Sequence, residues 1–164
     1  MIEAVTFDWG QTLAQRGSAE EPETALLGSA HALLESLRAR RLRLAVVATD
    51  RLEPSATIRA EIERLGVAER VDAVVVAGEP DALEAGSAAF ERALAELGVD
   101  ATAALHVGDR LVEDVAGAAE LGMTTAQALW FSADDTPAGV EPDFLAFTPM
   151  DVLNAVRRLA SGGA

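Results

Sequence analysis

The segment Val5-Thr6-Phe7-Asp8-Trp9-Gly10-Gln11-Thr12-Leu13 organises the rest of this chain. The apolar run 2–7 predicts a short buried strand, and the residues after it predict a turn because they include Gly10. Asp8 therefore stands at the carboxyl end of the first strand, with Thr12 four residues further on. In an open α/β sheet that end of a strand is where ligands bind, so Asp8 is the first candidate for a functional residue.

The composition is that of a globular protein. The 164 residues predict one domain, 1–164, and 50% of them are hydrophobic. The 27 acidic and 13 basic residues give a formal net charge of −14, which argues against nucleic-acid or anionic-membrane partners, since both bind basic surfaces. The chain begins without a basic segment and apolar stretch of the secretory kind, and no apolar run is long enough to span a membrane. A cytoplasmic location is therefore expected.

Two residue types with characteristic chemistry are missing from the sequence. Cysteine is absent, which excludes disulfides and thiol catalysis, and all 13 basic residues are arginine. No side chain can therefore form a lysine Schiff base or hold a phosphate as a lysine does.

Strand-like runs and helical patterns alternate along the chain. Further strands are expected at 42–48, 71–76, 104–107, 124–129 and 144–147, and helices at 24–37, 54–65, 82–97, 111–121 and 149–159. Gly66 and Gly98 are expected to end the second and third helices, and the polar segment 14–23 is expected to be a loop. The alternation predicts an α/β fold, a doubly wound, Rossmann-like parallel sheet with helices on both faces.

Polar residues stand at the ends of three predicted strands. Asp8 follows the first strand, Thr49 and Asp50 follow the second, and Asp109, with Asp114 nearby, follows the fourth. Carboxylates after the first and fourth strands converge if those strands are neighbours, and clustered carboxylates suit Mg²⁺, which prefers oxygen ligands. Each residue alone also fits a helix cap or a turn, so the combination carries the prediction.

Taken together, these residues resemble the motifs of the haloacid dehalogenase superfamily of phosphatases and related hydrolases. The first motif is similar to Phe7-Asp8-x-x-x-Thr12-Leu13, the second to Val46-Val47-Ala48-Thr49 and the fourth to Leu105-His106-Val107-Gly108-Asp109. The likeness covers about residues 2–129 and implies an uncapped single domain of this superfamily.

The resemblance implies a role for each residue of the site. Asp8 is implied to be the nucleophile and a metal ligand, and Asp109, with Asp114, to complete a Mg²⁺ site. The backbone carbonyl of Gly10 is implied to bind the same ion. Thr49, Asp50 and Gly10 are the expected substrate contacts, with Thr49 acting in catalysis by holding the phosphoryl group.

The sequence departs from the family pattern in two places. Gly10 stands where the family has an acid that protonates the leaving group and activates water. Glu84 stands where the family has a lysine that balances the nucleophile and the phosphate. Arg51 and Arg110 either replace that lysine electrostatically or are solvated surface residues. His106 is expected to have a structural role.

Two functions remain open. The first is a Mg²⁺-dependent phosphatase that acts through an aspartyl-phosphate with impaired acid–base machinery. The second is a catalytically inactive member of the family that binds a phosphorylated ligand or a protein partner. Neither interval between motifs has room for a cap domain, so an open site is expected. In this family, open sites usually act on large substrates or borrow a cover from a neighbouring subunit. The expected partners are therefore a phosphorylated small molecule or macromolecule and, to cover the site, a second subunit of a homo-oligomer.

Overall fold

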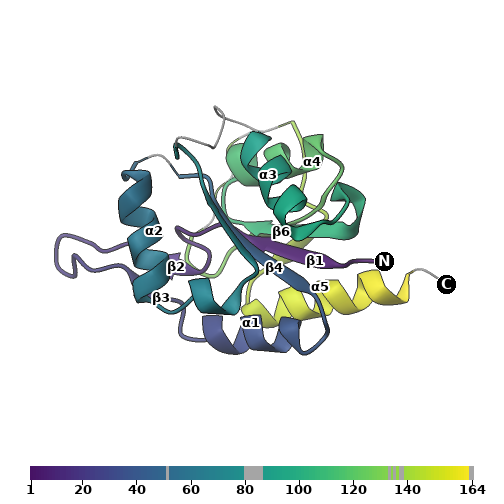
Figure 1. The fold of residues 1–164 in the computed structure, drawn as a ribbon, viewed down its shortest axis with the longest axis horizontal. Coiled ribbons are helices and arrows are strands. Elements are labelled where there is room, and N and C mark those ends of the chain that lie inside the picture. The colour runs from purple at the N-terminus through teal and green to yellow at the C-terminus, as the bar shows by residue number, and fades with distance from the viewer. Residues whose placement is uncertain (51, 80–86, 133, 135, 137–138, 163–164) are drawn as a thin grey trace.

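The computed structural model describes residues 1–50, 52–79, 87–132, 134, 136 and 139–162. Its centre is a six-stranded sheet with the strand order β5-β4-β1-β6-β7-β8, in which every neighbouring pair is parallel (Figure 1). The strands are β1 (Ala4–Phe7), β4 (Arg43–Ala48), β5 (Ala73–Val76), β6 (Ala104–Gly108), β7 (Thr124–Ala128) and β8 (Phe144–Ala146). The predicted parallel sheet and its predicted strands are confirmed.

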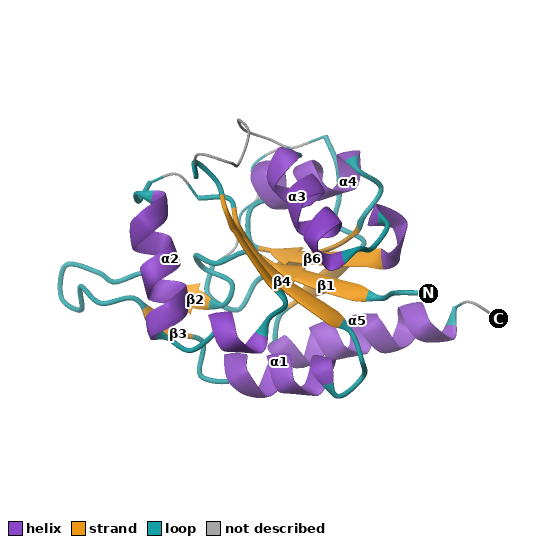
Figure 2. Cartoon of the chain, viewed as in Figure 1, coloured by secondary structure: helices purple, strands orange, loops and turns teal. Residues whose placement is uncertain are grey.

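Helices cover both faces of the sheet (Figure 2). They are α1 (Ala30–Arg38), α2 (Ser55–Arg64), α3 (Ala88–Leu97), α4 (Gly117–Glu120) and α5 (Pro149–Ser161). Apolar residues of α1, α2 and α5 pack in one core cluster with Phe7 and Leu44, whereas those of α3 and α4 pack in a second cluster with Val47 and Val75. Because both faces are covered, the central strands are buried along nearly their whole length, as is usual for parallel sheets.

The strand order reverses at β1, and this reversal places the site. The chain runs outward from β1 through β4 to β5, and then returns through α3 to β6 on the other side of β1. Phe7, the last residue of β1, lies opposite Val46 of β4 and Val107 of β6. The residues that follow these three strands are therefore neighbours at one edge of the sheet. In doubly wound folds, ligands bind in the crevice at such a reversal.

The segment between β1 and α1 differs from the prediction. Helix α1 begins at Ala30, and the chain before it forms a hairpin of two short antiparallel strands, β2 (Ala14–Gln15) and β3 (Ala25–Leu26). The N–H group of Leu27 donates to the carbonyl oxygen of Leu13 at 2.8 Å, which continues this pairing. The pairing keeps residues 25–27 extended, so the apolar spacing that suggested a helix here was misleading. In Figure 1 the hairpin projects beside α2.

The predicted helix 111–121 is two elements. It begins with a π-helical turn, η3 (Leu111–Ala116), and continues as the short helix α4. The N–H groups of Asp114 and Val115 both donate to the carbonyl oxygen of Arg110, at 3.0 and 3.1 Å. Widened turns of this kind occur frequently at functional sites. The first part of the predicted helix 82–97 lies outside the described residues, and α3 begins at Ala88.

No cap domain is present among the described residues. Strands and helices alternate there, and the largest insertion into this alternation is the β2–β3 hairpin. No helix in the described part of the chain is both long and apolar enough to cross a membrane.

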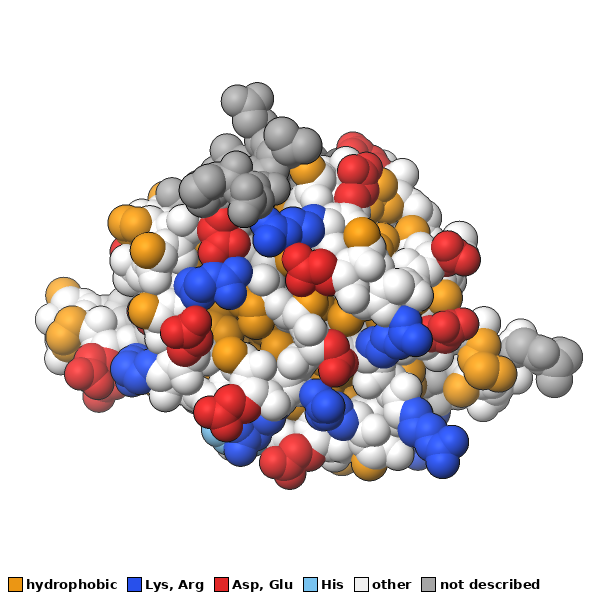
Figure 3. All heavy atoms as spheres, viewed as in Figure 1, with side chains coloured by type: hydrophobic (Ala, Val, Ile, Leu, Met, Phe, Trp, Pro, Cys, Tyr) orange, Lys and Arg blue, Asp and Glu red, His pale blue; other side chains and the backbone are white. Residues whose placement is uncertain are grey.

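On the face drawn in Figure 3, arginine side chains are interspersed with acidic ones. Several of the chain's arginines are paired with acids in this way, as in the ion pairs of Arg38 with Asp72 and of Arg59 with Glu79.

Candidate active site

Three buried carboxylates converge at the edge where β1 and β6 end. Asp8 follows β1 directly, and its N–H group donates to the carbonyl oxygen of Val107 at 2.9 Å, which fixes it beside β6. Asp109 follows β6, and Asp114 lies in η3. One carboxylate oxygen from each of the three lies within 4.8 Å of the others, and the residues are 2%, 6% and 0% exposed. The predicted convergence of Asp8 with Asp109 is therefore present in the fold.

Thr49 connects two of these carboxylates. Its N–H group donates to Asp8 Oδ1 at 3.2 Å, and its hydroxyl oxygen lies 3.4 Å from Asp8 Oδ1 and 3.0 Å from Asp114 Oδ1. The second oxygen of Asp114 accepts the N–H group of Arg110 at 3.0 Å. Asp109 Oδ1, by contrast, is buried without a hydrogen-bond partner among the described residues. An orphaned carboxylate oxygen beside two others is a suitable position for a cation ligand.

Burial and mutual repulsion raise the pKa values of two carboxyl groups in this cluster, Asp8 and Asp109. Burial raises the pKa of Asp8 well above its ordinary value, and the carboxylates of Asp114 and Asp109 raise it further. Burial, together with the charge of Asp114, raises the pKa of Asp109 to about 6. Three carboxylates at this separation repel one another when ionised, and a divalent cation bound between them removes that repulsion. The donor set is all oxygen, which fits Mg²⁺.

These shifts predict how stability depends on pH. A carboxyl group whose pKa is higher in the folded chain stabilises folding at low pH, and that stabilisation is lost as the pH rises through the folded value. Without metal, the free energy of unfolding should therefore fall between about pH 4 and pH 7. Asp109→Asn should remove part of this loss, on the order of 2 kcal/mol, as measured by urea denaturation in a chelator at pH 5 and pH 8.

Magnesium should reverse the effect. Ligand carboxyls must be deprotonated to bind the ion, so Mg²⁺ should raise the melting temperature at pH 8 and have little effect at pH 5. Asp109→Asn should abolish the Mg²⁺ response, whereas Asp72→Asn, at the opposite edge of the sheet, should retain it. An equal Mg²⁺ response in wild type and Asp109→Asn would place the ion elsewhere.

Gly108 is required for the position of Asp114. A Cβ atom on residue 108 would lie 2.4 Å from Asp114 Cγ and 2.5 Å from Asp114 Oδ2. Asp114 is fully buried, so its side chain has no open space into which it can move. Asp114 lies within the π-helical turn, and its carboxylate reaches the hydroxyl of Thr49 at the end of β4.

Gly108→Ala is therefore expected to disturb both folding and metal binding. Overpacking should lower the free energy of unfolding by about 1–3 kcal/mol, measured by urea denaturation. Displacement of Asp114 should weaken Mg²⁺ binding by about tenfold to a hundredfold, measured by calorimetry. Gly28→Ala is the matched control, because a Cβ atom at Gly28 meets nothing within 4 Å. A Gly108→Ala variant with wild-type Mg²⁺ affinity would show that Asp114 is not a ligand.

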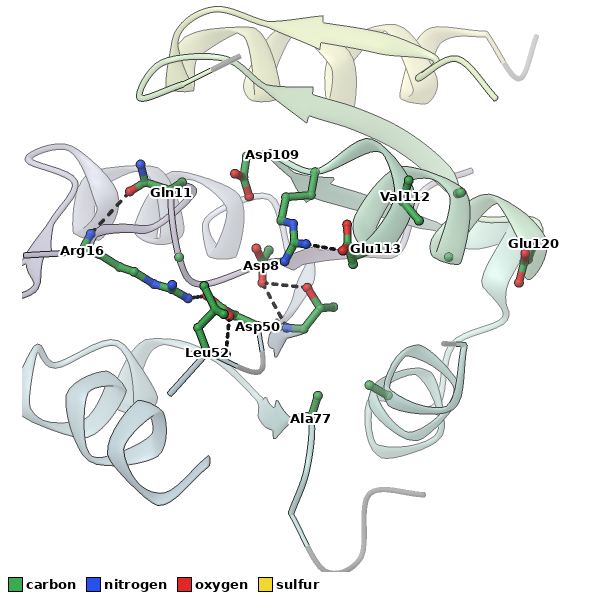
Figure 4. Close-up of a pocket in the computed structure, with 16 residues that line it drawn as sticks. Asp8, Gln11, Arg16, Asp50, Leu52, Ala77, Asp109, Val112, Glu113 and Glu120 are labelled. Atoms are coloured by element: carbon green, nitrogen blue, oxygen red, sulfur yellow. Dashed lines mark hydrogen bonds and ion pairs between the residues drawn. The ribbon is translucent and has the colours of Figure 1, made fainter. Parts of the chain in front are cut away.

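A pocket of about 820 Å³ opens above the carboxylates (Figure 4). Of the predicted site residues, Asp8, Gly10, Thr49, Asp50 and Asp109 line it. Asp114 lies beneath its floor, where it contacts Thr49. The predicted site residues are thus brought together by the fold. Glu84 and Arg51 lie outside the described residues, so their predicted roles stay predictions.

Several lining residues were not predicted from the sequence, and Gln11 and Arg16 are the two polar ones nearest to Gly10 along the chain. Gln11 has a left-handed backbone with a φ of 57°, which is uncommon for a residue other than glycine. Its side-chain oxygen accepts the N–H group of Arg16 at 3.4 Å, and the Arg16 guanidinium forms an ion pair with Asp50. Arg16 lies on a segment that was predicted to be a loop. The one sequence feature that could have identified it is a basic residue close to Asp8 in a chain without lysine.

Two other predictions can be compared with the structure. His106 is almost fully buried, its Nδ1 lies 2.8 Å from the hydroxyl of Thr6, and its ring packs edge-on against Phe90. These contacts are those of a packed, buried side chain, but Nε2 also lies 3.6 Å from Asp114 Oδ1, so the ring borders the carboxylate cluster and its expected structural role stays a prediction. The guanidinium of Arg110 lines the pocket and pairs with Glu113, so Arg110 is positioned to affect the charge of the site.

The comparisons with known proteins agree with this fold. In fold, the chain is similar to an uncharacterized protein from Listeria monocytogenes, with 21% identity, coverage of 98% of this chain and 99% of that one, and a TM-score of 0.80. It is similar to a predicted phosphoglycolate phosphatase from Haemophilus somnus, with 15% identity, coverage of 94% and 98%, and a TM-score of 0.76.

A 2-haloacid dehalogenase from Pseudomonas syringae is 26% identical, with coverage of 83% of this chain and 55% of that one, and a TM-score of 0.67. No curated protein matches the sequence. The family model for haloacid dehalogenase-like hydrolases matches residues 2–122, which is most of the chain and includes β1, β4 and β6 with the residues that follow them. The chain belongs to the haloacid dehalogenase-like hydrolases.

Proposed function

We propose that this protein is a Mg²⁺-dependent phosphatase that cleaves phosphomonoesters through an aspartyl-phosphate on Asp8. The observation that carries the proposal is the convergence of the Asp8, Asp109 and Asp114 carboxylates, buried and within 4.8 Å of one another, at the floor of an open pocket. Asp8, Asp109 and Asp114, with the carbonyl oxygen of Gly10, would hold the ion. When bound, Mg²⁺ would neutralise the carboxylates and the phosphoryl oxygens.

The hydrogen bonds of Asp8 indicate which of its oxygens attacks. The N–H group of Thr49 donates to Asp8 Oδ1, and the Thr49 hydroxyl lies on the same side, 3.4 Å from that atom, so we assign the attack on phosphorus to Oδ2. In the first step a bond forms between Oδ2 and phosphorus while the bond from phosphorus to the leaving oxygen breaks, and the leaving group keeps the electron pair. In the second step water attacks phosphorus, and the bond to Oδ2 breaks, which restores the Asp8 carboxylate; the proton of the attacking water leaves with the phosphate or passes to solvent.

The absence of a side chain at Gly10 limits the leaving groups. No acid at position 10 can protonate the departing oxygen, so aryl and acyl phosphates should react faster than alkyl phosphates. The pocket fits such groups, because the exposed apolar residues Leu52 and Val112 stand at its rim and Ala77 and Ala116 line its wall. Figure 4 shows Leu52 and Val112 on either side of Asp8.

Without a cap in the described part of the chain, the pocket is open to phosphorylated groups on small molecules and on macromolecules alike. A second subunit of a homo-oligomer is a further candidate to cover it.

The proposal is tested by assaying a panel of phosphomonoesters with Mg²⁺ and with a chelator. Release of inorganic phosphate that needs Mg²⁺ and is faster for aryl than for alkyl esters is the expected result. Equal rates with Mg²⁺ and with the chelator would contradict the proposed metal site.

A second candidate function, binding of a phosphorylated ligand or a protein partner without turnover, is favoured by one observation. The acid that completes the family's reaction is replaced by Gly10, while the carboxylate cluster and Thr49 are retained. A protein that binds inorganic phosphate in the presence of Mg²⁺ but hydrolyses no ester of the panel would have this function.

A further inference from the structure

The described side chains that line the pocket carry more negative than positive charge. Its described lining includes five carboxylates and two guanidinium groups, which belong to Asp8, Asp50, Asp109, Glu113, Glu120, Arg16 and Arg110. A phosphate dianion entering this surplus of negative charge needs cationic partners besides the metal. With no lysine anywhere in the sequence, those partners must be arginines.

The two arginines differ in their surroundings. Arg110 pairs with Glu113, three residues along the same turn, and both side chains are well exposed, at 40% and 37%. Arg16 comes from the β2–β3 hairpin and pairs across the pocket with Asp50, whose side chain is 12% exposed. Figure 4 shows the Arg16 side chain reaching from the hairpin toward Asp50, below Asp8. Charges in the less exposed pair are screened less by water, so they act more strongly on a bound anion.

Arg16 lies over the position that Gly10 leaves open. A Cβ atom on residue 10 would be 3.4 Å from the Nε and from one terminal nitrogen of Arg16, and 3.5 Å from Asp50 Oδ2. The ion pair therefore occupies the space beside the backbone two residues after the nucleophile. A larger residue at position 10 would compete with the guanidinium for that space. The observed position of Arg16 therefore depends on the glycine.

The guanidinium is also held in place. Asp50 Oδ1 accepts the N–H group of Leu52 at 2.8 Å, which fixes the carboxylate that Arg16 contacts. At the other end, the backbone of Arg16 donates to the side chain of Gln11. A guanidinium has five N–H donors, and its pairing with one carboxylate leaves others to donate to phosphoryl oxygens.

We propose that Arg16 binds the phosphoryl oxygens of the substrate, with Asp50 as the positioning residue that orients its guanidinium. The anion site is thus built from the hairpin and the end of β4. This inference rests on the proposed function in assuming a phosphorylated ligand, but it holds equally if the protein binds that ligand without hydrolysing it.

The test is calorimetric titration of the full chain with inorganic phosphate in the presence of Mg²⁺. Arg16→Gln should weaken phosphate binding by about tenfold to a hundredfold, because it removes charge-assisted hydrogen bonds. Arg16→Lys should recover part of the loss, since it restores the charge but not the planar set of donors. Asp50→Asn should weaken binding less, and combining it with Arg16→Gln should add little, because both act through one guanidinium.

The matched control is the ion pair of Arg59 with Glu79, whose side chains are 36% and 16% exposed, close to the 32% and 12% of Arg16 with Asp50. Neither Arg59 nor Glu79 lines the pocket. Arg59→Gln and Glu79→Gln should bind phosphate as wild type does, while showing the general effect of losing a partly buried ion pair on stability.

The outcomes separate this proposal from the proposed function. Phosphate binding that is unchanged in Arg16→Gln and Arg16→Lys overturns the role of Arg16, even if the wild type hydrolyses esters. Binding that depends on Arg16 in a protein without turnover upholds the role of Arg16 and overturns the hydrolase. A wild type that binds no phosphate overturns the role of Arg16 outright. If Arg16→Gln does not fold, the comparison of Arg16→Lys with wild type decides, and equal affinities count against the proposal.

Discussion

The Asp8→Asn variant is expected to lower turnover of an aryl phosphate by about 10⁴-fold or more, because an amide cannot form the aspartyl-phosphate. Folding should be retained. Asparagine has nearly the same size, and the substitution removes a carboxylate whose raised pKa reflects burial and repulsion by Asp114 and Asp109. In a chelator at pH 8 the variant should therefore be at least as stable as wild type. The measurement is kcat for an aryl phosphate together with the melting temperature.

Asp72→Asn is the matched control for this experiment. Asp72 also accepts a backbone hydrogen bond, from the N–H group of Leu44 at 2.8 Å, but it lies before β5, at the edge of the sheet opposite the pocket. Its replacement should leave kcat unchanged. Turnover that persists undiminished in Asp8→Asn would show that the hydrolysis takes place at another site or on another protein in the preparation.

Gly10→Asp is expected to raise turnover of alkyl phosphates by up to about 10²–10⁴-fold, because it supplies the group that protonates the leaving oxygen. The backbone permits the change. Gly10 is not among the glycines with a left-handed φ, and a Cβ atom there would be in ordinary contact, 3.4 Å or more from its neighbours. Aryl phosphates should gain much less, since their leaving groups need little protonation. The measurement is the ratio of kcat for an alkyl to kcat for an aryl phosphate.

The structure adds a second expectation for this variant. The new carboxylate would lie beside Arg16 and Asp50, so it would compete for the guanidinium that we assign to phosphate binding. KM should therefore rise while kcat for alkyl phosphates rises. Gly28→Asp adds the same charge at an exposed glycine away from the pocket, and should change neither quantity. A Gly10→Asp variant that binds Mg²⁺ and phosphate but gains no preference for alkyl esters would count against Asp8 being poised for attack.

The sequence predicted those parts of the site that depend only on residues near one another along the chain. Asp8, Thr49 and Asp109 were recognised because each stands directly after a buried strand, and parallel strands place their carboxyl ends at one edge. The ends of α2 and α3 were equally local. Gly66 and Gly98 follow them with left-handed φ values of 71° and 63°, which glycine adopts readily.

The hairpin was not predictable in the same way. Apolar residues at 26, 27 and 30 fit one face of a helix, and Ala14 and Gln15 carry no strong strand signal. The pairing of β2 with β3 depends on contacts made once Leu13 and Ala14 are buried beneath the sheet edge. The position of Arg16 beside Asp50 depends on that hairpin. The two residues are more than thirty positions apart in the sequence, so only the folded chain brings them together.

The sequence by itself determined the parallel sheet, the order of its strands and helices along the chain, and the carboxylates at its ligand-binding edge. These follow from hydrophobic runs and turn residues, which act over a few positions. Tertiary structure alone decided the reversal of strand order at β1, the π-helical turn that brings Asp114 over Gly108, and the ion pair beside Gly10. Each of these depends on which atoms come into contact when distant segments pack, and on the space that a missing side chain leaves between them.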